Sequence, residues 1–131
     1  MIHKFTVPGQ PIPYTRTTTK GKFVSEQWQR YAMYKNRIAA AFVNSINNDD
    51  LRIKCLQNLK RYGKVLHTGN QKIYVSSIAY FANKKHGDMD NIHKGILDAL
   101  FVSDKYVAGA FDFYYDAQNP RLEVTIWQQD G

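Results

Sequence analysis

The chain has 131 residues, of which 44% are hydrophobic and 22% are charged, so it is long enough for one globular domain with its own core. No run approaches the roughly 20 apolar residues that span a bilayer, and the first residues lack the apolar stretch of a secretory signal. We therefore expect a cytoplasmic protein with no membrane partner. The single cysteine, Cys55, excludes an intrachain disulfide and a cysteine-based zinc site, and we expect its thiol to be buried.

Charge is divided unevenly along the chain. Residues 1–87 contain 15 Lys and Arg against 3 Asp and Glu, whereas residues 88–131 contain 3 against 8, which gives charges of +12 and −5 within the net +7. A basic surface is typical of proteins that bind the phosphate backbone of nucleic acids. An acidic segment repels that same partner unless a cation lies between them. The pattern therefore favours a nucleic-acid-binding protein with a cation site.

The first part of the chain predicts a strand, an irregular segment and a long helix. Residues 3–7 alternate weakly, as a strand does, and the proline-rich VPGQPIP ends this strand. Residues 14–24, YTRTTTKGKFV, predict a small hairpin or a basic flap around Gly21. Ser25 and Glu26 are typical of a helix start. The expected core-facing side of this helix comprises Trp28, Tyr31, Ala32, Ile38, Ala39, Phe42 and Ile46.

The remaining elements complete a single α+β domain over residues 1–131. The weak pattern of residues 47–71 predicts one short amphipathic helix with Leu51, Cys55, Leu56 and Leu59 on its apolar side. Residues 72–81 predict a buried strand, and a second helix is expected from position 87 or 88 to about position 101. The strands FDFYYDA and RLEVTIW, joined by a short QNP turn, predict a C-terminal β-hairpin. We expect these strands to form a mixed sheet with the helices packed on it.

Residues 87–98 read GDMDNIHKGILD and place three aspartates and a lysine on the second predicted helix. At about 100° per residue, Asp90, Lys94 and Asp98 lie on one side of that helix. Its opposite side carries Ile92, Ile96, Ala99 and Leu100, which would pack on the sheet. The motif therefore predicts a polar stripe on a helix that is anchored in the core.

The polar stripe has a purely structural interpretation. Asp88 would cap the helix N-terminus, and Asp90 would complement the helix dipole. Asp90, Lys94 and Asp98 would then form a surface ladder of ion pairs, each of which contributes little. Because such pairs are common, the motif taken alone favours this interpretation.

The stripe also allows a cation site. An EF-hand loop is excluded, because it needs glycine at its sixth position and an acid at its twelfth, where this chain has His93 and Ala99. A magnesium site is compatible with Asp88 and Asp90 at the helix start and Asp104 from the following loop. Such a site supplies an activated water and charge neutralisation for phosphodiester hydrolysis, and the lysine of the motif would stabilise developing negative charge.

The motif resembles that of the RusA-type Holliday-junction resolvases, crossover junction endodeoxyribonucleases often found in phages and prophages. The family pattern G-D-x-D-N-x-x-K-x-x-L-D-A-L is present here as GDMDNIHKGILDAL. Four further segments resemble the family in the same order, namely VPGQPIPYTR, VSEQWQRY, VSDKYV and NPRLEVTI. The resemblance therefore covers most of the chain.

The resemblance implies a magnesium-dependent, structure-selective endodeoxyribonuclease, with Mn²⁺ as a possible substitute for Mg²⁺, that resolves four-way DNA junctions. It also implies a homodimer, because two related active sites make symmetric nicks in opposing strands. The implied metal-binding catalytic acids are Asp88, Asp90 and Asp104, and Lys94 is the implied catalytic lysine. We assign Asn91 and Asp98, which also belong to the motif, to structural support of the site.

A loop and a strand residue depart from the family pattern. Family members often have paired aspartates and a glutamine in the loop that here reads Ser103-Asp104-Lys105-Tyr106, and a lysine in the next strand where this chain has Tyr114. Since the core motif is intact, we expect these departures to affect substrate handling and rate and not the catalytic chemistry itself. Residues 47–71 also form a longer segment than is typical of the family.

The remaining candidates are basic, aromatic and histidine residues. We expect Arg16, Lys20 and Lys22, beside an exposed Tyr14, to form a DNA-contacting loop, and Lys84 and Lys85 to contact phosphates, which sets affinity and not sequence choice. His86 and His93 flank the acids, but such histidines are more often solvated than ligands. Two other functions stay open: a non-catalytic module that binds branched or single-stranded nucleic acid, and a nuclease that acts on flaps or RNA.

Overall fold

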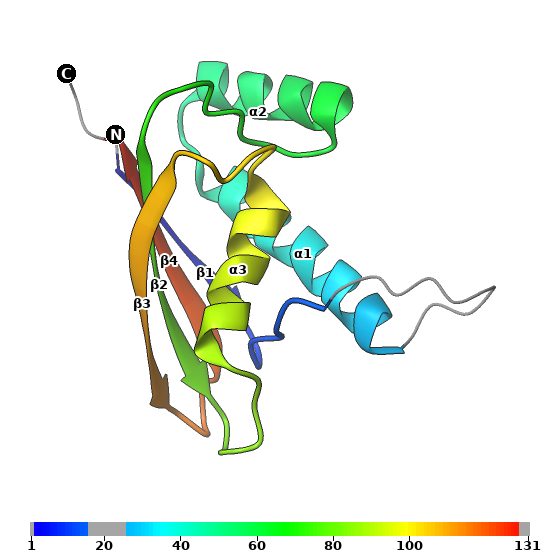
Figure 1. The fold of residues 1–131 in the computed structure, drawn as a ribbon, viewed down its shortest axis with the longest axis vertical. Helices are drawn as coiled ribbons and strands as arrows, with labels where there is room; N and C mark the ends of the chain where they lie inside the picture. Colours follow the sequence, from blue (N-terminus) through cyan, green and yellow to red (C-terminus); the bar gives the residue numbers. More distant parts are fainter. Residues whose placement is uncertain (1, 16–25, 129–131) are drawn as a thin grey trace.

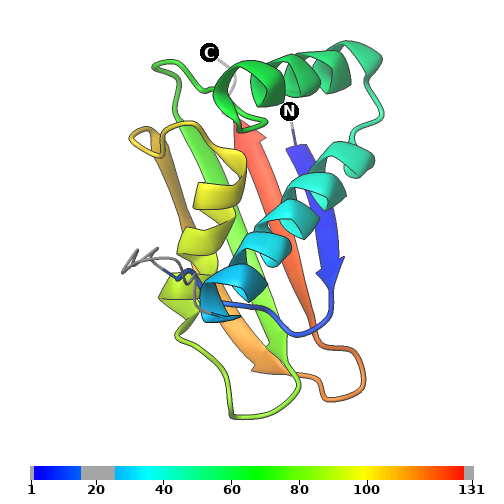
Figure 2. The ribbon, with the colours of Figure 1, turned by 90° about the vertical axis from the view of Figure 1, so that its right-hand side faces the viewer.

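A computed structural model of the protein describes residues 2–15 and 26–128. Within these ranges the chain forms, in order, β1 (Ile2–Pro8), α1 (Glu26–Ser45), α2 (Asp49–Tyr62), β2 (Ile73–Phe81), α3 (Met89–Leu100), β3 (Val107–Tyr115) and β4 (Arg121–Gln128). The strands form one mixed sheet, and α1 and α3 lie across one of its faces, with α2 at one end of the domain (Figures 1 and 2). The predicted α+β class is therefore confirmed. No helix in the described ranges is long and apolar enough to cross a membrane.

The sheet has the strand order β1-β4-β2-β3, which contradicts the predicted C-terminal hairpin. β3 pairs with β2 in parallel, and β4 pairs antiparallel with both β1 and β2, so β2 lies between the two strands that were expected to pair. This order arises because α3 returns the chain to the end of the sheet where β2 begins, so that β3 runs parallel to β2. Residues 116–120 then carry the chain from β3 past the end of β2 to its other side, where β4 begins. The short turn between β3 and β4 therefore joins two strands that do not pair with each other.

The core lies between the sheet and its two covering helices. Alternate residues of β2 and β4 are buried on the helix face, as period-2 strands with one covered face require. α1 and α3 each bury one side against them. The most deeply buried large side chains include Tyr31, Tyr34, Ile38 and Phe42 of α1, Ile92, Ile96 and Leu100 of α3, and Phe81, Leu122 and Ile126 of the sheet. Each such side chain contributes about 1.5–3 kcal/mol of burial energy, which fixes α3 firmly on the sheet.

The short helix expected within residues 47–71 is present as α2. It begins after Asn48, whose side-chain oxygen accepts a hydrogen bond from the Leu51 N–H at 3.0 Å, and it ends at Gly63 with a φ of 76°. Cys55 is buried, as expected. Leu56 and Leu59, which were expected on the apolar side of this helix, are 50% and 44% exposed. α2 lies at one end of the domain (Figure 1), and Cys55 is the one residue of this helix that is buried.

Candidate active site

Two acids of the motif, Asp88 and Asp90, lie at the N-terminal end of α3. Asp88 has an extended backbone (φ −66°, ψ 140°), and its carbonyl accepts the N–H groups of Asn91 and Ile92, both at 3.1 Å. Its side chain makes no capping hydrogen bond, so the capping interpretation of this residue is wrong. Asp90 accepts the N–H of Asn91 on its Oδ1 at 2.9 Å. Both side chains are exposed, and neither forms an ion pair with a described residue.

Lys94 lies one turn further along α3 and is held by an aromatic ring. Its Nζ lies 4.5 Å from the ring centroid of Tyr14, which belongs to the proline-rich segment after β1. The Tyr14 N–H donates to the carbonyl of Asn91 at 3.1 Å, and its ring packs edge-on against Tyr31 of α1. Tyr14 is thus packed between α1 and α3. Its expected role as a freely exposed ring is only partly met, because its side chain is half-buried.

The third acid of the motif, Asp98, is surrounded by partners from other elements. The Tyr31 hydroxyl donates to it at 2.5 Å, the Lys35 ammonium lies at 3.0 Å, and the Lys64 ammonium lies at 3.5 Å. Burial raises the pKa of the Asp98 carboxyl, but these hydrogen bonds and the two lysine charges outweigh burial, so its pKa lies below the ordinary value. Asp98 therefore ties α3 to α1 and to the segment after α2. The predicted ladder from Asp90 through Lys94 to Asp98 is not formed.

Asp104 lies beyond the C-terminal end of α3, in the turn that leads to β3. Its carbonyl accepts the Val107 N–H at 3.0 Å, and its side chain is exposed. It lines a hollow of about 310 Å³ together with Tyr14, Lys94 and Asp98. The structure therefore brings Asp104 and Lys94 to one hollow.

The three acids predicted to bind metal do not meet within one chain. Asp90 and Leu100 lie ten positions apart, which is about 15 Å along the helix axis, and Asp104 follows beyond that end of α3, whereas Mg²⁺ needs its oxygen ligands at about 2.1 Å. In agreement, the described residues contain no group of three Asp, Glu, His or Cys side chains arranged to hold a metal. Of the three acids, only Asp88 and Asp90 lie at the same end of α3. Oxygen donors of this kind fit a hard cation, so the pair suits magnesium but leaves the site short of protein ligands.

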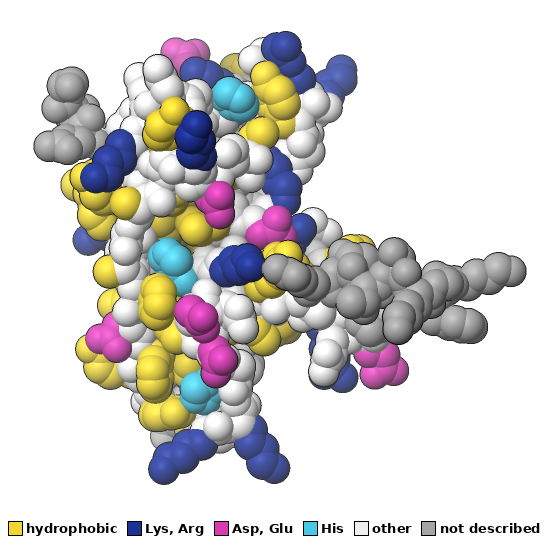
Figure 3. All heavy atoms as spheres, in the orientation of Figure 1, with side chains coloured by type: hydrophobic (Ala, Val, Ile, Leu, Met, Phe, Trp, Pro, Cys, Tyr) yellow, Lys and Arg dark blue, Asp and Glu magenta, His cyan; other side chains and the backbone are white. Residues whose placement is uncertain are grey.

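The two histidines beside the acids are engaged in structural contacts. His86 stacks on Phe81 with ring centroids 3.7 Å apart, donates from Nδ1 to the Gly87 carbonyl and accepts from the Tyr115 hydroxyl on Nε2, both at 2.8 Å. The Nδ1 of His93 lies 2.7 Å from the hydroxyl of Ser77, and burial lowers the pKa of the His93 imidazole. Figure 3 shows acidic, histidine and lysine side chains following one another on this face, beside a row of hydrophobic side chains.

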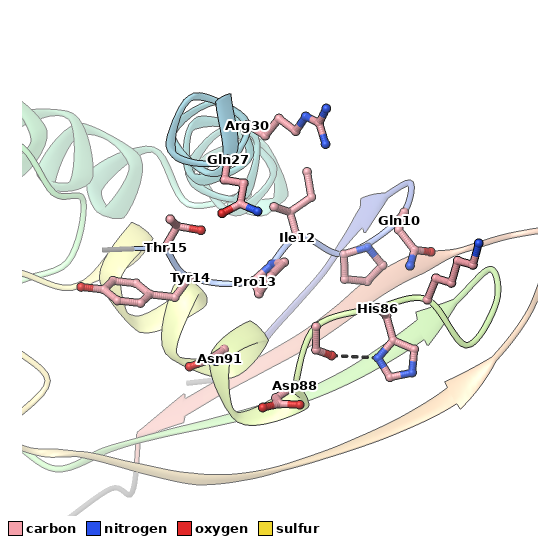
Figure 4. A pocket seen from close by; sticks show the side chains of 13 residues that line it. Gln10, Ile12, Pro13, Tyr14, Thr15, Gln27, Arg30, His86, Asp88 and Asn91 are labelled. Carbon is pink, nitrogen blue, oxygen red and sulfur yellow. Dashed lines mark hydrogen bonds between the residues drawn. The ribbon is translucent and has the colours of Figure 1, made fainter. Parts of the chain in front are cut away.

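A larger cavity, of about 990 Å³, opens beside Asp88. We call it the proline-segment cavity, because the segment from Gln10 to Thr15 forms much of its wall. Gln27 and Arg30 of α1 line it from one side, and the start of α3 lines it from the other (Figure 4). Sequence patterns did not indicate Gln10, Gln27 or Arg30 as site residues, because their segments meet only in the folded protein.

The basic residues predicted to contact DNA are only partly described. Lys84 and Lys85 are exposed in the loop before α3, and Lys85 lines the proline-segment cavity. Arg16, Lys20 and Lys22 lie outside the described residues, as do the hairpin predicted around Gly21 and the helix start at Ser25.

Comparison with known proteins agrees with the resemblance seen in the motif. The family described as Endodeoxyribonuclease RusA matches residues 6–127, which is nearly the whole chain and includes both cavities and all the acids discussed above. No curated protein matches the chain. Members of this family resolve Holliday junctions and generally depend on a divalent metal. The chain therefore belongs to the RusA family of endodeoxyribonucleases, which are hydrolases acting on DNA.

Proposed function

We propose that the protein is a magnesium-dependent, structure-selective endonuclease that resolves Holliday junctions by paired symmetric nicks and acts as a homodimer in the cytoplasm. The observation that carries this proposal is the pair of exposed carboxylates, Asp88 and Asp90, at the start of α3 in a RusA-family fold. Carboxylate oxygens suit Mg²⁺, with Mn²⁺ as an alternative. When bound, the cation supplies an activated water and neutralises charge on the scissile phosphate.

The residues of the chain have distinct roles in this proposal. Asp88 and Asp90 hold the cation, and Lys94 offsets the negative charge that develops on the phosphate. Tyr14 positions Lys94 through the contact of its ring with the ammonium. Asp98 does not contact the cation in this proposal; its ion pairs with Lys35 and Lys64 fix the orientation of α3.

The edge strand β3 supports the dimer. Phe111, Phe113 and Tyr115 on this strand are between 43% and 49% exposed. The Tyr106 carbonyl and the Asp116 N–H bond to β2, so the backbone groups of the odd-numbered residues between them point away from the sheet. A long apolar edge that lacks lysine and proline is a template for pairing with another strand. A second copy of the chain, pairing antiparallel through β3, fits this edge.

Such pairing would also complete the metal site. Antiparallel pairing places the start of one β3 beside the end of the other. Asp104 precedes β3 by three residues, while the end of β3 pairs with Phe81, just before the loop that leads to Asp88. Asp104 of one copy would therefore approach the Asp88 and Asp90 pair of the other, and the helices of both copies would lie on the same face of one continuous sheet. Both sites would then face one DNA junction.

Replacing Asp90 by asparagine tests the proposed function. We expect the wild type to nick a four-way junction only with Mg²⁺ or Mn²⁺, and Asp90→Asn to bind the junction but nick it about 100-fold more slowly or worse. The matched control is Asp50→Asn, because Asp50 is an exposed acid in the first turn of α2. If the wild type nicks no junction with either metal, the protein is a binding module and the proposal fails.

A substrate panel separates a resolvase from a nuclease with another target. Turnover is compared on a four-way junction, a flap, a duplex and RNA at one salt concentration, because a basic protein binds all of them at low salt. Faster cleavage of a flap or of RNA than of the junction would contradict the proposed substrate.

A further inference from the structure

The proline-segment cavity has walls suited to a flat apolar ligand. Its apolar lining includes Pro11, Ile12, Pro13 and Tyr14. This wall is fixed, because Gly87 lies so close to Pro13 that a Cβ at position 87 would come within 2.7 Å of the Pro13 Cγ. The volume of about 990 Å³ lies at the upper end of the range of small-ligand sites, about 300–1,000 Å³. The cavity is therefore preformed and large enough for one nucleotide.

Three amide side chains, Gln10, Gln27 and Asn91, line the same cavity. The Oε1 of Gln10 accepts the Ala82 N–H at 2.8 Å, and its NH₂ group makes no hydrogen bond to another described residue. Gln27 and Asn91 make no side-chain hydrogen bond to another described residue. An amide group combines a donor and an acceptor in one plane, and this combination matches the edge of a nucleobase. Among the described residues, these amides thus keep donor and acceptor groups that suit the edge of a base.

Charge at the rim indicates where the phosphates of such a nucleotide would lie. Arg30 and Lys85 contribute two cations to the lining, and Asp88 lies at the start of α3 on the same cavity. Arg30 and Lys85 suit a phosphate directly, whereas Asp88 tolerates one only through a bound cation. A nucleotide with its base in the cavity would therefore carry its phosphate toward the metal-binding acids.

We propose that the proline-segment cavity accepts one unpaired nucleobase next to the scissile phosphate and that Gln27 reads the edge of this base. The inference rests on the proposed function, because it places the cavity on the strand to be cut. A base stacked inside a duplex does not reach such a cavity, but a base at a branch point does so at small energetic cost. The cavity thereby selects branched DNA, and its amides select among bases at the cleavage position.

The first test measures base capture without cleavage. The Asp90→Asn variant is bound, in the absence of metal, to a four-way junction that carries the fluorescent base 2-aminopurine at the branch point. We expect fluorescence to rise as the base leaves the stack. A second substitution, Gln27→Trp, fills the cavity and should abolish the rise, whereas Gln29→Trp on the exposed side of α1 should not. Equal signals from both Trp variants would overturn the proposal.

The second test measures the choice of cleavage position on junctions that carry each of the four bases beside the branch. We expect the wild type to prefer some bases and Gln27→Leu to reduce that preference by about tenfold, with Gln29→Leu as the control. Retention of the full preference by Gln27→Leu would contradict the role of Gln27. Base capture without any cleavage by the wild type would contradict the proposed function but support base binding in the cavity. Cleavage with neither base capture nor base preference would support the proposed function but contradict base binding in the cavity.

Discussion

At the scale of single residues, the aspartates of one motif have opposite environments. Asp88 and Asp90 are exposed and pair with no described cation, whereas Asp98 is surrounded by Tyr31 and two lysines. The difference follows from their positions, because Asp98 lies two helical turns further along α3, where α1 crosses it. Free carboxylates are available to a cation, and a paired one stabilises the fold.

We predict that Asp98→Asn destabilises the protein by about 1–2 kcal/mol at pH 7, because Lys35 and Lys64 lose their partner and Tyr31 loses its acceptor. The pKa of Asp98 lies below its ordinary value of 3.8, so its contribution is present above that pH and is lost as the pH falls through the lowered pKa. Urea unfolding at pH 7 and across pH 2–5 measures both effects. The difference in the free energy of unfolding between Asp98→Asn and the wild type should therefore shrink as the pH falls. A difference at pH 2 as large as that at pH 7 would contradict the prediction.

At the scale of elements, glycine decides how closely α1 approaches α3. A Cβ on Gly95 would lie 3.3 Å from the Cε1 of Tyr31 and 3.7 Å from the backbone nitrogen of Tyr14. Tyr31 has little freedom to move, because it is buried and bonded to Asp98. The glycine therefore permits the contact that brings the proline-rich segment and Lys94 together.

We predict that Gly95→Ala destabilises the fold by about 1 kcal/mol, since overpacking against Tyr31 exceeds the gain of about 1 kcal/mol in helix propensity. Gly63→Ala serves for comparison. A Cβ on Gly63 would have no described atom within 4 Å, but the φ of 76° disfavours alanine, so we expect a cost of about 1 kcal/mol from backbone strain alone. Thermal unfolding measures both, and only Gly95→Ala should also slow junction cleavage by displacing Tyr14.

The edge strand β3 provides a second prediction at this scale. We predict that Phe113→Lys converts the proposed dimer to a monomer, because a charge within the paired edge blocks strand pairing. Sedimentation measures the change. The matched control is Ile53→Lys on α2, which replaces another hydrophobic residue that is 53% exposed. A dimer that survives Phe113→Lys would place the interface elsewhere.

At the scale of the whole molecule, the separation of the acids bears on how many chains form the proposed metal site. Asp104 lies at the opposite end of α3 from Asp88 and Asp90, so one chain offers a pair of acids and a distant third. Pairing of two β3 edges in the register that sets Phe111 opposite its own copy places Val107 opposite Tyr115 and Asp112 opposite Ala110, which avoids repulsion between two copies of Asp112. Each complete site would then draw on both chains.

We predict that mixing two inactive variants, Asp90→Asn and Asp104→Asn, restores cleavage. In a mixed dimer one site carries both substitutions and the other carries neither, so one strand of a junction is nicked at up to half of the wild-type rate. Nicking of labelled junctions by the separate and mixed proteins measures the effect. Absence of any recovery in a mixture shown to form mixed dimers would mean that each site is built within one chain.

Several features follow from the sequence because they depend on neighbours along the chain. The period-2 pattern of residues 73–81 and the helical pattern of residues 89–100 predicted β2 and α3. The spacing within GDMDNIHKGILDAL was sufficient to indicate the family, which the comparison confirms. The uneven charge indicated a cation site near position 88, and this assignment stays a prediction.

Other features were decided only by the tertiary structure, because periodicity reports which side of a segment is apolar and not which segment covers it. The alternation of β3 and β4 suited a hairpin, yet β2 lies between them. The partners of Asp98 come from positions 31, 35 and 64, and no local pattern connects them. The proline-segment cavity likewise joins three distant stretches of chain. The sequence by itself determined the elements and the chemistry of the motif, and the packing of distant segments determined which of its acids are free to act.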